Sequence, residues 1–108
     1  MPIVFHQQGN STVIAVEGRL DIASSAAFEA EVAALLGNGS TAFLFDCTKL
    51  NYVSSAGLRA FLVLNKRVVA AGHRLCLCAL QPSVLQVFDM SGFSDIFPLR
   101  ATVAEALA

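Results

Sequence analysis

The chain has 108 residues, a length typical of one domain, and we expect residues 1–108 to form a single domain. Its net charge is −1 and its acidic and basic residues are interleaved, so the sequence offers no basic patch for nucleic acid. Hydrophobic residues make up 56% and charged residues only 14%, against about 25% in typical domains, so we expect exposed apolar surface for a partner.

Turn signals and hydrophobic periodicity divide the chain into alternating strands and helices. In chain order, the pattern predicts strands at 2–8 and 11–17, a loop at 18–21, a helix from there to 36, a strand at 42–46, a helix at 55–71, a strand at 73–80, a helix from 82 to the turn at 92, a short edge strand at 94–98 and a short helix near 102–107. The order β-β-α-β-α-β-α-β-α predicts an α/β fold with a mixed, mostly parallel sheet and one antiparallel hairpin at the start.

Turn and capping residues mark several of these boundaries. The Gly9-Asn10 pair between the first two strands is typical of a tight hairpin turn. Ser24 or Ser25 can cap the first helix, because a serine hydroxyl accepts a free amide of the first turn. Thr102 and Glu105 have the spacing of a capping box, which predicts the terminal helix.

Residues that could carry catalysis or bind a metal are few. His6 and His73 lie at predicted strands without other ligands at metal-binding spacing. Cys76 and Cys78 would point to the same face of a strand, but with Cys47 they supply three thiols where zinc sites need four ligands. The sequence has no phosphate-binding loop and no nucleophile motif. We therefore expect no catalysis, no cofactor and no metal.

The sequence also bears on location. The N-terminus lacks a basic region followed by a long apolar run, so we expect no secretory signal. The most apolar predicted helix is interrupted by Arg59, Asn65, Lys66 and Arg67, and falls short of the ~20 apolar residues of a membrane span. The odd number of cysteines, all in apolar runs, indicates reduced and buried thiols. We expect a cytoplasmic protein without membrane insertion.

The most informative segment joins a buried strand to the long helix at 55–71 through two adjacent serines, Ser54 and Ser55. Serine is a favoured N-cap, and capping alone accounts for one of the two. Gly57 lies in the first turn, where a residue without Cβ lets another backbone or a ligand approach. Free amides at a helix start can also hold an anion, including a phosphate on a serine there. Capping and regulation are both open interpretations.

Several segments share their order and spacing with a known family. They are Val16–Asp21, Phe45–Leu50, Tyr52–Leu58, Ala71–Leu75, Gly92–Phe97 and Glu105–Leu107. Together they resemble the STAS domain family over nearly the whole chain, in particular the anti-sigma factor antagonists of bacteria. The resemblance implies a STAS fold and a partner-switching regulator.

In such a cycle, the unphosphorylated antagonist binds an anti-sigma factor that is also a serine kinase, and so frees the sigma factor. Phosphorylation of a serine dissociates the pair, and a serine phosphatase resets it. The resemblance implies that Ser55 is the phosphoacceptor, with Ser54 in place of the family's aspartate and as the alternative acceptor. Asp21 and Asp46 match the family's other recurrent acidic positions.

A partner-contact surface follows from the helix spacing, because residues three or four apart share a face. The expected contact residues are Asp21, Asp46, Ser54, Ser55, Gly57, Arg59, Val63 and Lys66. Two other functions are open. The chain could be a small STAS subunit that docks on a membrane transport ATPase for lipids. It could also bind a small molecule, since Asp21, Asp46 and Ser55 could converge at the strand ends where α/β proteins place their sites.

Overall fold

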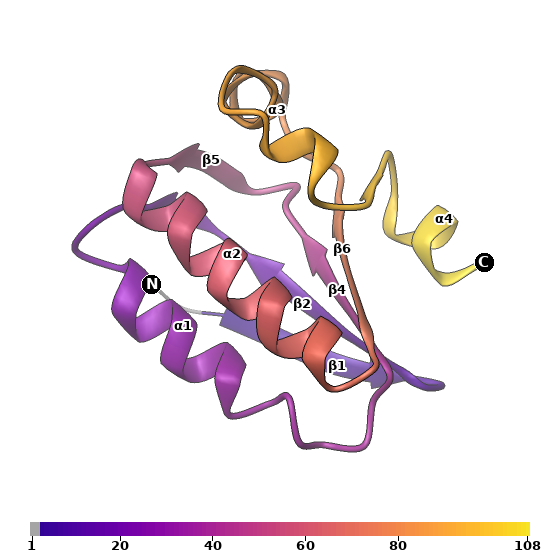
Figure 1. Ribbon diagram of the computed structural model, residues 1–108. Coiled ribbons are helices and arrows are strands. Elements are labelled where there is room, and N and C mark those ends of the chain that lie inside the picture. Colours follow the sequence, from indigo (N-terminus) through magenta and orange to yellow (C-terminus); the bar gives the residue numbers. More distant parts are fainter. Residues whose placement is uncertain (1–2) are drawn as a thin grey trace.

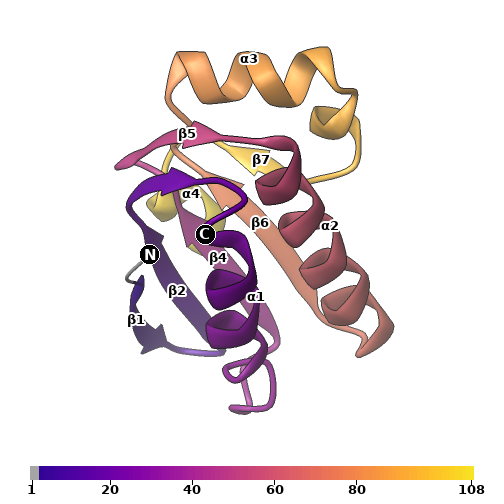
Figure 2. The same cartoon turned by 90° about the vertical axis from the view of Figure 1, so that its left-hand side faces the viewer.

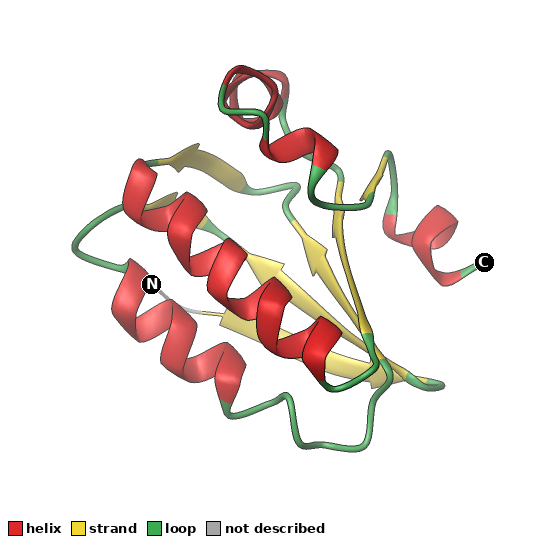
Figure 3. Ribbon diagram, in the orientation of Figure 1, coloured by secondary structure: helices red, strands yellow, loops and turns green. Residues whose placement is uncertain are grey.

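The computed structural model describes residues 3–108, so the predicted start of the first strand at residue 2 lies outside the described residues. Figure 3 shows strands and helices alternating along most of the chain. In chain order, the elements are β1 (Ile3–Gln8), β2 (Ser11–Val16), β3 (Gly18–Leu20), α1 (Ser25–Ala33), β4 (Ala42–Asp46), β5 (Leu50–Val53), α2 (Ser55–Ala70), β6 (Arg74–Cys78), α3 (Pro82–Met90), a 3-10 turn (Phe93–Asp95), β7 (Leu99–Arg100) and α4 (Val103–Leu107).

The main sheet has the strand order β1-β2-β4-β6-β7. Strands β1 and β2 are antiparallel and meet at the Gly9-Asn10 turn, where Gly9 has a φ of +60° that favours glycine. The other neighbours in the main sheet, β2 with β4, β4 with β6 and β6 with β7, are parallel. The predicted mixed, mostly parallel sheet with an opening hairpin is confirmed.

Helices α1 and α2 lie side by side over one face of the main sheet (Figure 1, Figure 2). Phe61 of α2 lies at the centre of the core on this face, with its ring centroid 5.4 Å from that of Phe28 in α1 and 5.5 Å from that of Phe45 in β4. Helix α4 packs against the opposite face, where Ala106 joins Leu44. The fully buried Phe61 therefore fixes the position of α2 on the sheet.

A second, small sheet pairs β3 with β5 in parallel. The sequence predicted a loop at 18–21 and no strand at 50–53, and both expectations were wrong. Strands of three and four residues are too short to show an alternating pattern, and Gly18 adopts a φ of +84° as its N–H donates to the carbonyl of Lys49 at 2.8 Å. This small sheet leads directly into α2.

The C-terminal segment differs from the prediction in one place. The predicted edge strand at 94–98 was wrong: the chain forms a 3-10 turn, and the edge strand begins only at Leu99. Phe97 is buried with its ring centroid 5.9 Å from that of Phe88, and this packing draws the segment into a turn. The predicted cap of the last helix is confirmed, because the Thr102 hydroxyl accepts the Glu105 N–H at 3.1 Å.

Candidate functional site

The structure separates the roles of the two serines at the start of α2. Ser54 is the N-cap: its backbone is extended, and its hydroxyl accepts the Gly57 N–H at 3.3 Å. The Ser54 N–H donates to the carbonyl of Leu20 at 2.9 Å, which ties the helix start to β3. Ser54 is therefore engaged on both its backbone and its side chain.

Ser55 occupies the first turn of α2 and is exposed. Within residues 3–108, its hydroxyl has no hydrogen-bond partner, and the N–H groups of Ser55 and Ala56 have no acceptor. Unpaired amides at a helix N-terminus carry partial positive charge and stabilise an anion. The Ser55 hydroxyl is thus available for modification at a place that favours negative charge.

Gly57 is buried where the start of α2 packs against Leu20 of β3. A Cβ added to Gly57 would lie 2.6 Å from the carbonyl oxygen of Leu20 and 2.8 Å from Cγ2 of Val53, closer than real side chains come. The sequence left open whether a backbone or a ligand approaches Gly57, and in the structure the backbone of Leu20 does so. Gly57 positions the helix start and presents no surface of its own to a partner.

A depression of about 420 Å³ lies between α1 and α2 beside Ser55. Its lining residues come from both helices and from the turn before α1: Ile22, Ser25, Ala26, Glu29, Ser55, Ala56, Arg59 and Ala60. The sequence predicted only the α2 side of this depression. Ile22 is 86% exposed, and a large apolar side chain at the start of the predicted helix is the signal that could have pointed to the other side.

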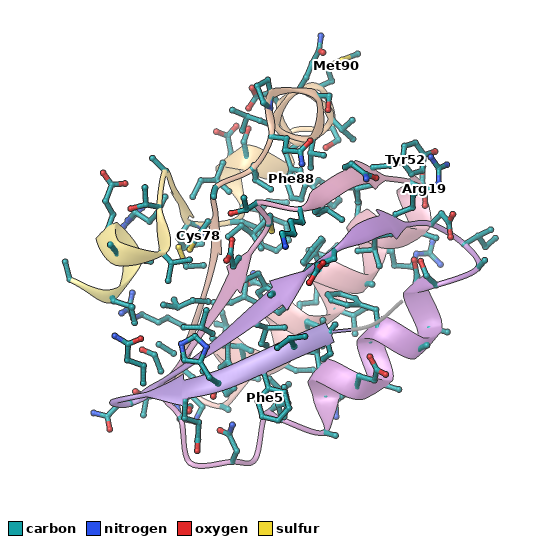
Figure 4. The ribbon with its side chains drawn as sticks, turned by 180° about the vertical axis from the view of Figure 1, so that it is seen from behind. Phe5, Arg19, Tyr52, Cys78, Phe88 and Met90 are labelled. Carbon is teal, nitrogen blue, oxygen red and sulfur yellow. The ribbon has the colours of Figure 1, made fainter. Side chains whose placement is uncertain are left out.

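Arg19 and Tyr52 form a further feature at this end of the molecule. The Arg19 guanidinium lies 4.0 Å from the centroid of the Tyr52 ring, a cation–π contact between β3 and β5 (Figure 4). Tyr52 is 40% exposed and precedes Ser55 by three residues. Neither residue was predicted, because the cross-strand pairing of β3 with β5 was not recognised.

Asp21 is part of the turn that precedes α1. Its carboxylate accepts the N–H groups of Ala23 at 3.0 Å and Ser24 at 3.2 Å, and lies 3.7 Å from the Arg19 side chain. Burial alone would raise the pKa of Asp21, but these hydrogen bonds and the nearby Arg19 lower it below its ordinary value. Asp21 thus organises the turn that carries Ile22.

Helix α1 begins later than predicted as a consequence. Residues 21–24 form the turn, and the helix starts at Ser25 and ends at Ala33, followed by further turns up to Gly37. Ser24 occupies the N-cap position, but its hydroxyl makes no capping hydrogen bond and donates instead to the carbonyl of Arg19 at 2.9 Å. The expected serine cap does not form, because the Ser24 hydroxyl is engaged with the Arg19 carbonyl.

Asp46 lies apart from the α1–α2 depression. Its carboxylate accepts the N–H of Thr48 at 3.1 Å and the Thr48 hydroxyl at 2.6 Å. It lines a separate hollow of about 220 Å³ with Glu17 and Lys49. Asp46 and Ser55 therefore line different hollows, and Asp21 lines neither of them.

The outer side of α2 carries unpaired positive charge. Arg59 and Lys66 are exposed, and Val63 between them is half-buried. In the part of the chain that the structure describes, the one ion pair is that of Arg19 with Asp21, so neither Arg59 nor Lys66 is neutralised. These side chains are free to meet acidic groups of a partner.

The three cysteines lie away from this site. All three thiols are free and buried, and burial raises the pKa of Cys47. Among residues 3–108, no three His, Cys, Asp or Glu side chains gather in a way that could hold a metal ion. None of the helices described in residues 3–108 has the length and apolar character needed to cross a membrane.

Comparison with known proteins gives consistent matches. A family model described as the STAS domain matches residues 2–106. BtrV of Bordetella bronchiseptica, named as a candidate anti-sigma factor antagonist, is 38% identical over 96 residues, or 89% of this chain and 82% of BtrV. The anti-sigma-B factor antagonist of Bacillus subtilis is 29% identical over 96 residues, or 88% of this chain and 86% of that protein.

The fold is also similar to solved structures of the anti-sigma factor antagonist SpoIIAA. The unphosphorylated form has a TM-score of 0.83 at 22% identity, covering 98% of this chain and 93% of that one. The phosphorylated form has a TM-score of 0.75 at 21% identity, with 98% and 96% covered. These likenesses concern the fold, whereas the family model and the 38% identical relative define the family. This chain belongs to the STAS domain family.

Proposed function

We propose that this chain is an anti-sigma factor antagonist that binds an anti-sigma factor with serine kinase activity and is released when Ser55 is phosphorylated. The observation that carries the proposal is the exposed Ser55 hydroxyl, unpartnered among residues 3–108, at the α1–α2 depression. The names of the two relatives support the same function. In this proposal the chain is a cytoplasmic regulator and not an enzyme, and a separate serine phosphatase resets it.

The docking surface that we propose consists of the α1–α2 depression, its neighbours Arg19 and Tyr52, and the outer residues Val63 and Lys66 of α2. It combines an exposed isoleucine and an exposed tyrosine with the exposed cations Arg59 and Lys66 and with Arg19, which is paired with Asp21. Such a surface fits a partner that is apolar at the centre and acidic at the rim.

The other residues predicted for partner contact have different places in this proposal. Ser54, Gly57 and Asp21 act indirectly, because their hydrogen bonds and close packing hold the start of α2 and the turn before α1 in position. Asp46 lies outside the docking surface. Ser55 is the preferred phosphoacceptor over Ser54, since the Ser54 hydroxyl is committed to the cap.

Phosphorylation would place negative charge at the centre of the docking surface. A phosphoserine adds about −1.5 to −2 charge at neutral pH. In the free protein, the unpaired amides at the start of α2 would stabilise this charge by up to about 2 kcal/mol. In the complex, the same charge would be desolvated against an acidic and apolar partner, which is unfavourable. The free protein would tolerate the phosphate and the complex would not.

The site of modification can be tested with the cognate anti-sigma factor kinase and ATP. We expect mass spectrometry to find phosphate on Ser55 in the wild type and in Ser54→Ala, and none in Ser55→Ala. Ser83→Ala is the matched control, since Ser83 is also an exposed serine in the first turn of a helix. Phosphate on Ser54 in the Ser55→Ala protein, or equal phosphorylation of Ser83, would contradict the proposal.

A further inference from the structure

Strand β1 is the outermost strand of the main sheet, and no strand among residues 3–108 pairs with its outer edge (Figure 2). The two edges of the sheet differ. At the other edge, β7 has only two residues, follows Pro98 and is packed against α4. β1 is six residues long and pairs with β2 without a bulge. One edge is thus short and covered, and the other is long and open.

The sequence of β1 lacks the devices that normally prevent an open edge from pairing. Proteins protect such edges with charged side chains, proline, bulges or very short strands. Residues 3–8 contain no Asp, Glu, Lys or Arg and no proline. Two of its apolar side chains are largely exposed, Val4 at 63% and Phe5 at 49%. In Figure 4, Phe5 projects from β1 at the outer side of the sheet.

The hairpin geometry defines which backbone groups face outward. Gln8 pairs with Ser11 across a two-residue turn, and the residues that flank such a turn form a hydrogen-bonded pair. Because this pattern alternates along antiparallel strands, Ile3, Phe5 and Gln7 direct their N–H and C=O groups away from β2. These are the groups that a further strand would bind.

We propose that β1 pairs in antiparallel fashion with β1 of a second copy of this chain, about a two-fold axis at Phe5. Phe5 then lies opposite Phe5 of the second copy as a hydrogen-bonded pair, and Ile3 lies opposite Gln7. On the opposite face, Val4 lies opposite His6 as a non-hydrogen-bonded pair. The two main sheets join into one continuous sheet.

A second copy fits this edge because the strand is complementary to itself in this register. The two Phe5 rings, which share the sheet face with Ile14, would bury each other, and aromatic cross-strand pairs stabilise sheets. Residues 3–8 contain no Asp, Glu, Lys or Arg, and His6 lies opposite Val4, so self-pairing places no like charges opposite each other. The two-fold pairing occupies the open β1 edge of each copy. The edges that remain are the two short β7 strands, so association stops at a dimer.

The dimer is independent of the proposed docking surface, because none of residues 3–8 lines the α1–α2 depression. A strand pair of this length buries less area than a permanent interface, so we expect a dissociation constant in the micromolar range. Sedimentation velocity of the full chain from about 5 to about 500 μM should show a monomer–dimer equilibrium. A monomer throughout, or growth into larger assemblies, would overturn the proposal.

Two sets of variants test the register. Phe5→Lys places two like charges opposite each other and should weaken dimerisation at least about tenfold, whereas Met90→Lys, at an 81% exposed residue of α3, should not. Because the native thiols are buried, an equimolar mixture of Val4→Cys and His6→Cys chains should form a disulfide-linked dimer under mild oxidation far more readily than either chain alone. Equal effects of the two lysines, or equal cross-linking in all three samples, would contradict the arrangement.

Discussion

Replacing Gly57 with alanine tests how α2 is positioned. The new Cβ would lie 2.6 Å from the carbonyl oxygen of Leu20, which must retreat by about 0.8 Å to reach ordinary contact. Overpacking of this kind costs about 1–3 kcal/mol, and strain on the hydrogen bond from Ser54 to Leu20 adds about 1 kcal/mol. Alanine has a higher helix propensity than glycine, which offsets about 1 kcal/mol of this cost. The net loss is about 1–3 kcal/mol.

Thermal unfolding of Gly57→Ala should therefore show a midpoint about 5–15 °C below that of the wild type. The matched control is Gly37→Ala, because an added Cβ at Gly37 meets no atom within 4 Å and its φ is not in the left-handed region. This control should be neutral or stabilised by up to about 1 kcal/mol. If Gly57→Ala is as stable as Gly37→Ala, then α2 does not press against β3 as described.

Three further predictions concern the same end of the molecule. Ser54→Ala removes the cap of α2 and should lower the free energy of unfolding in urea by about 1 kcal/mol, but an unchanged value would exclude the cap. Because the pKa of Asp21 is lowered in the folded protein, its carboxylate stabilises the fold above pH 3.8, and this stabilisation is lost as the pH falls through the folded pKa. Wild type and Asp21→Asn should therefore differ in melting temperature at pH 6 and converge in acid, and a difference that stays constant with pH would refute this. Ile22→Ala should weaken partner binding about tenfold with an unchanged melting temperature, because this side chain is 86% exposed, and equal affinity would remove it from the contact.

The parts of the fold predicted from the sequence are those with long periodic patterns or specific turn residues. The opening hairpin follows from Gly9-Asn10 between two apolar runs, and α2 follows from sixteen residues with helical spacing. The small β3–β5 sheet could not be predicted, because its three- and four-residue strands are stabilised by pairing between distant segments and not by local pattern.

The candidate site was predicted on one side only. The two serines and the glycine at the start of α2 are consecutive or nearly so, and their helix-start chemistry is local. Ile22 and Glu29 reach the same depression only through the packing of α1 against α2, which periodicity does not specify. Asp46 was grouped with Ser55 because both were expected at the strand ends where α/β proteins place their sites, but the Asp46 side chain turns to Thr48 in a separate hollow.

The most direct test of the central claim is the affinity of three proteins, wild type, Ser55→Asp and Ser55→Ala, for the anti-sigma factor partner by calorimetry. A carboxylate at the start of α2 is tolerated in the free protein, so all three should have similar melting temperatures. We expect Ser55→Asp to bind at least about 30-fold more weakly than the wild type, Ser55→Ala to stay within a few-fold, and the control Ser83→Asp to bind normally. If Ser55→Asp and Ser55→Ala bind with equal affinity, negative charge at Ser55 does not control docking.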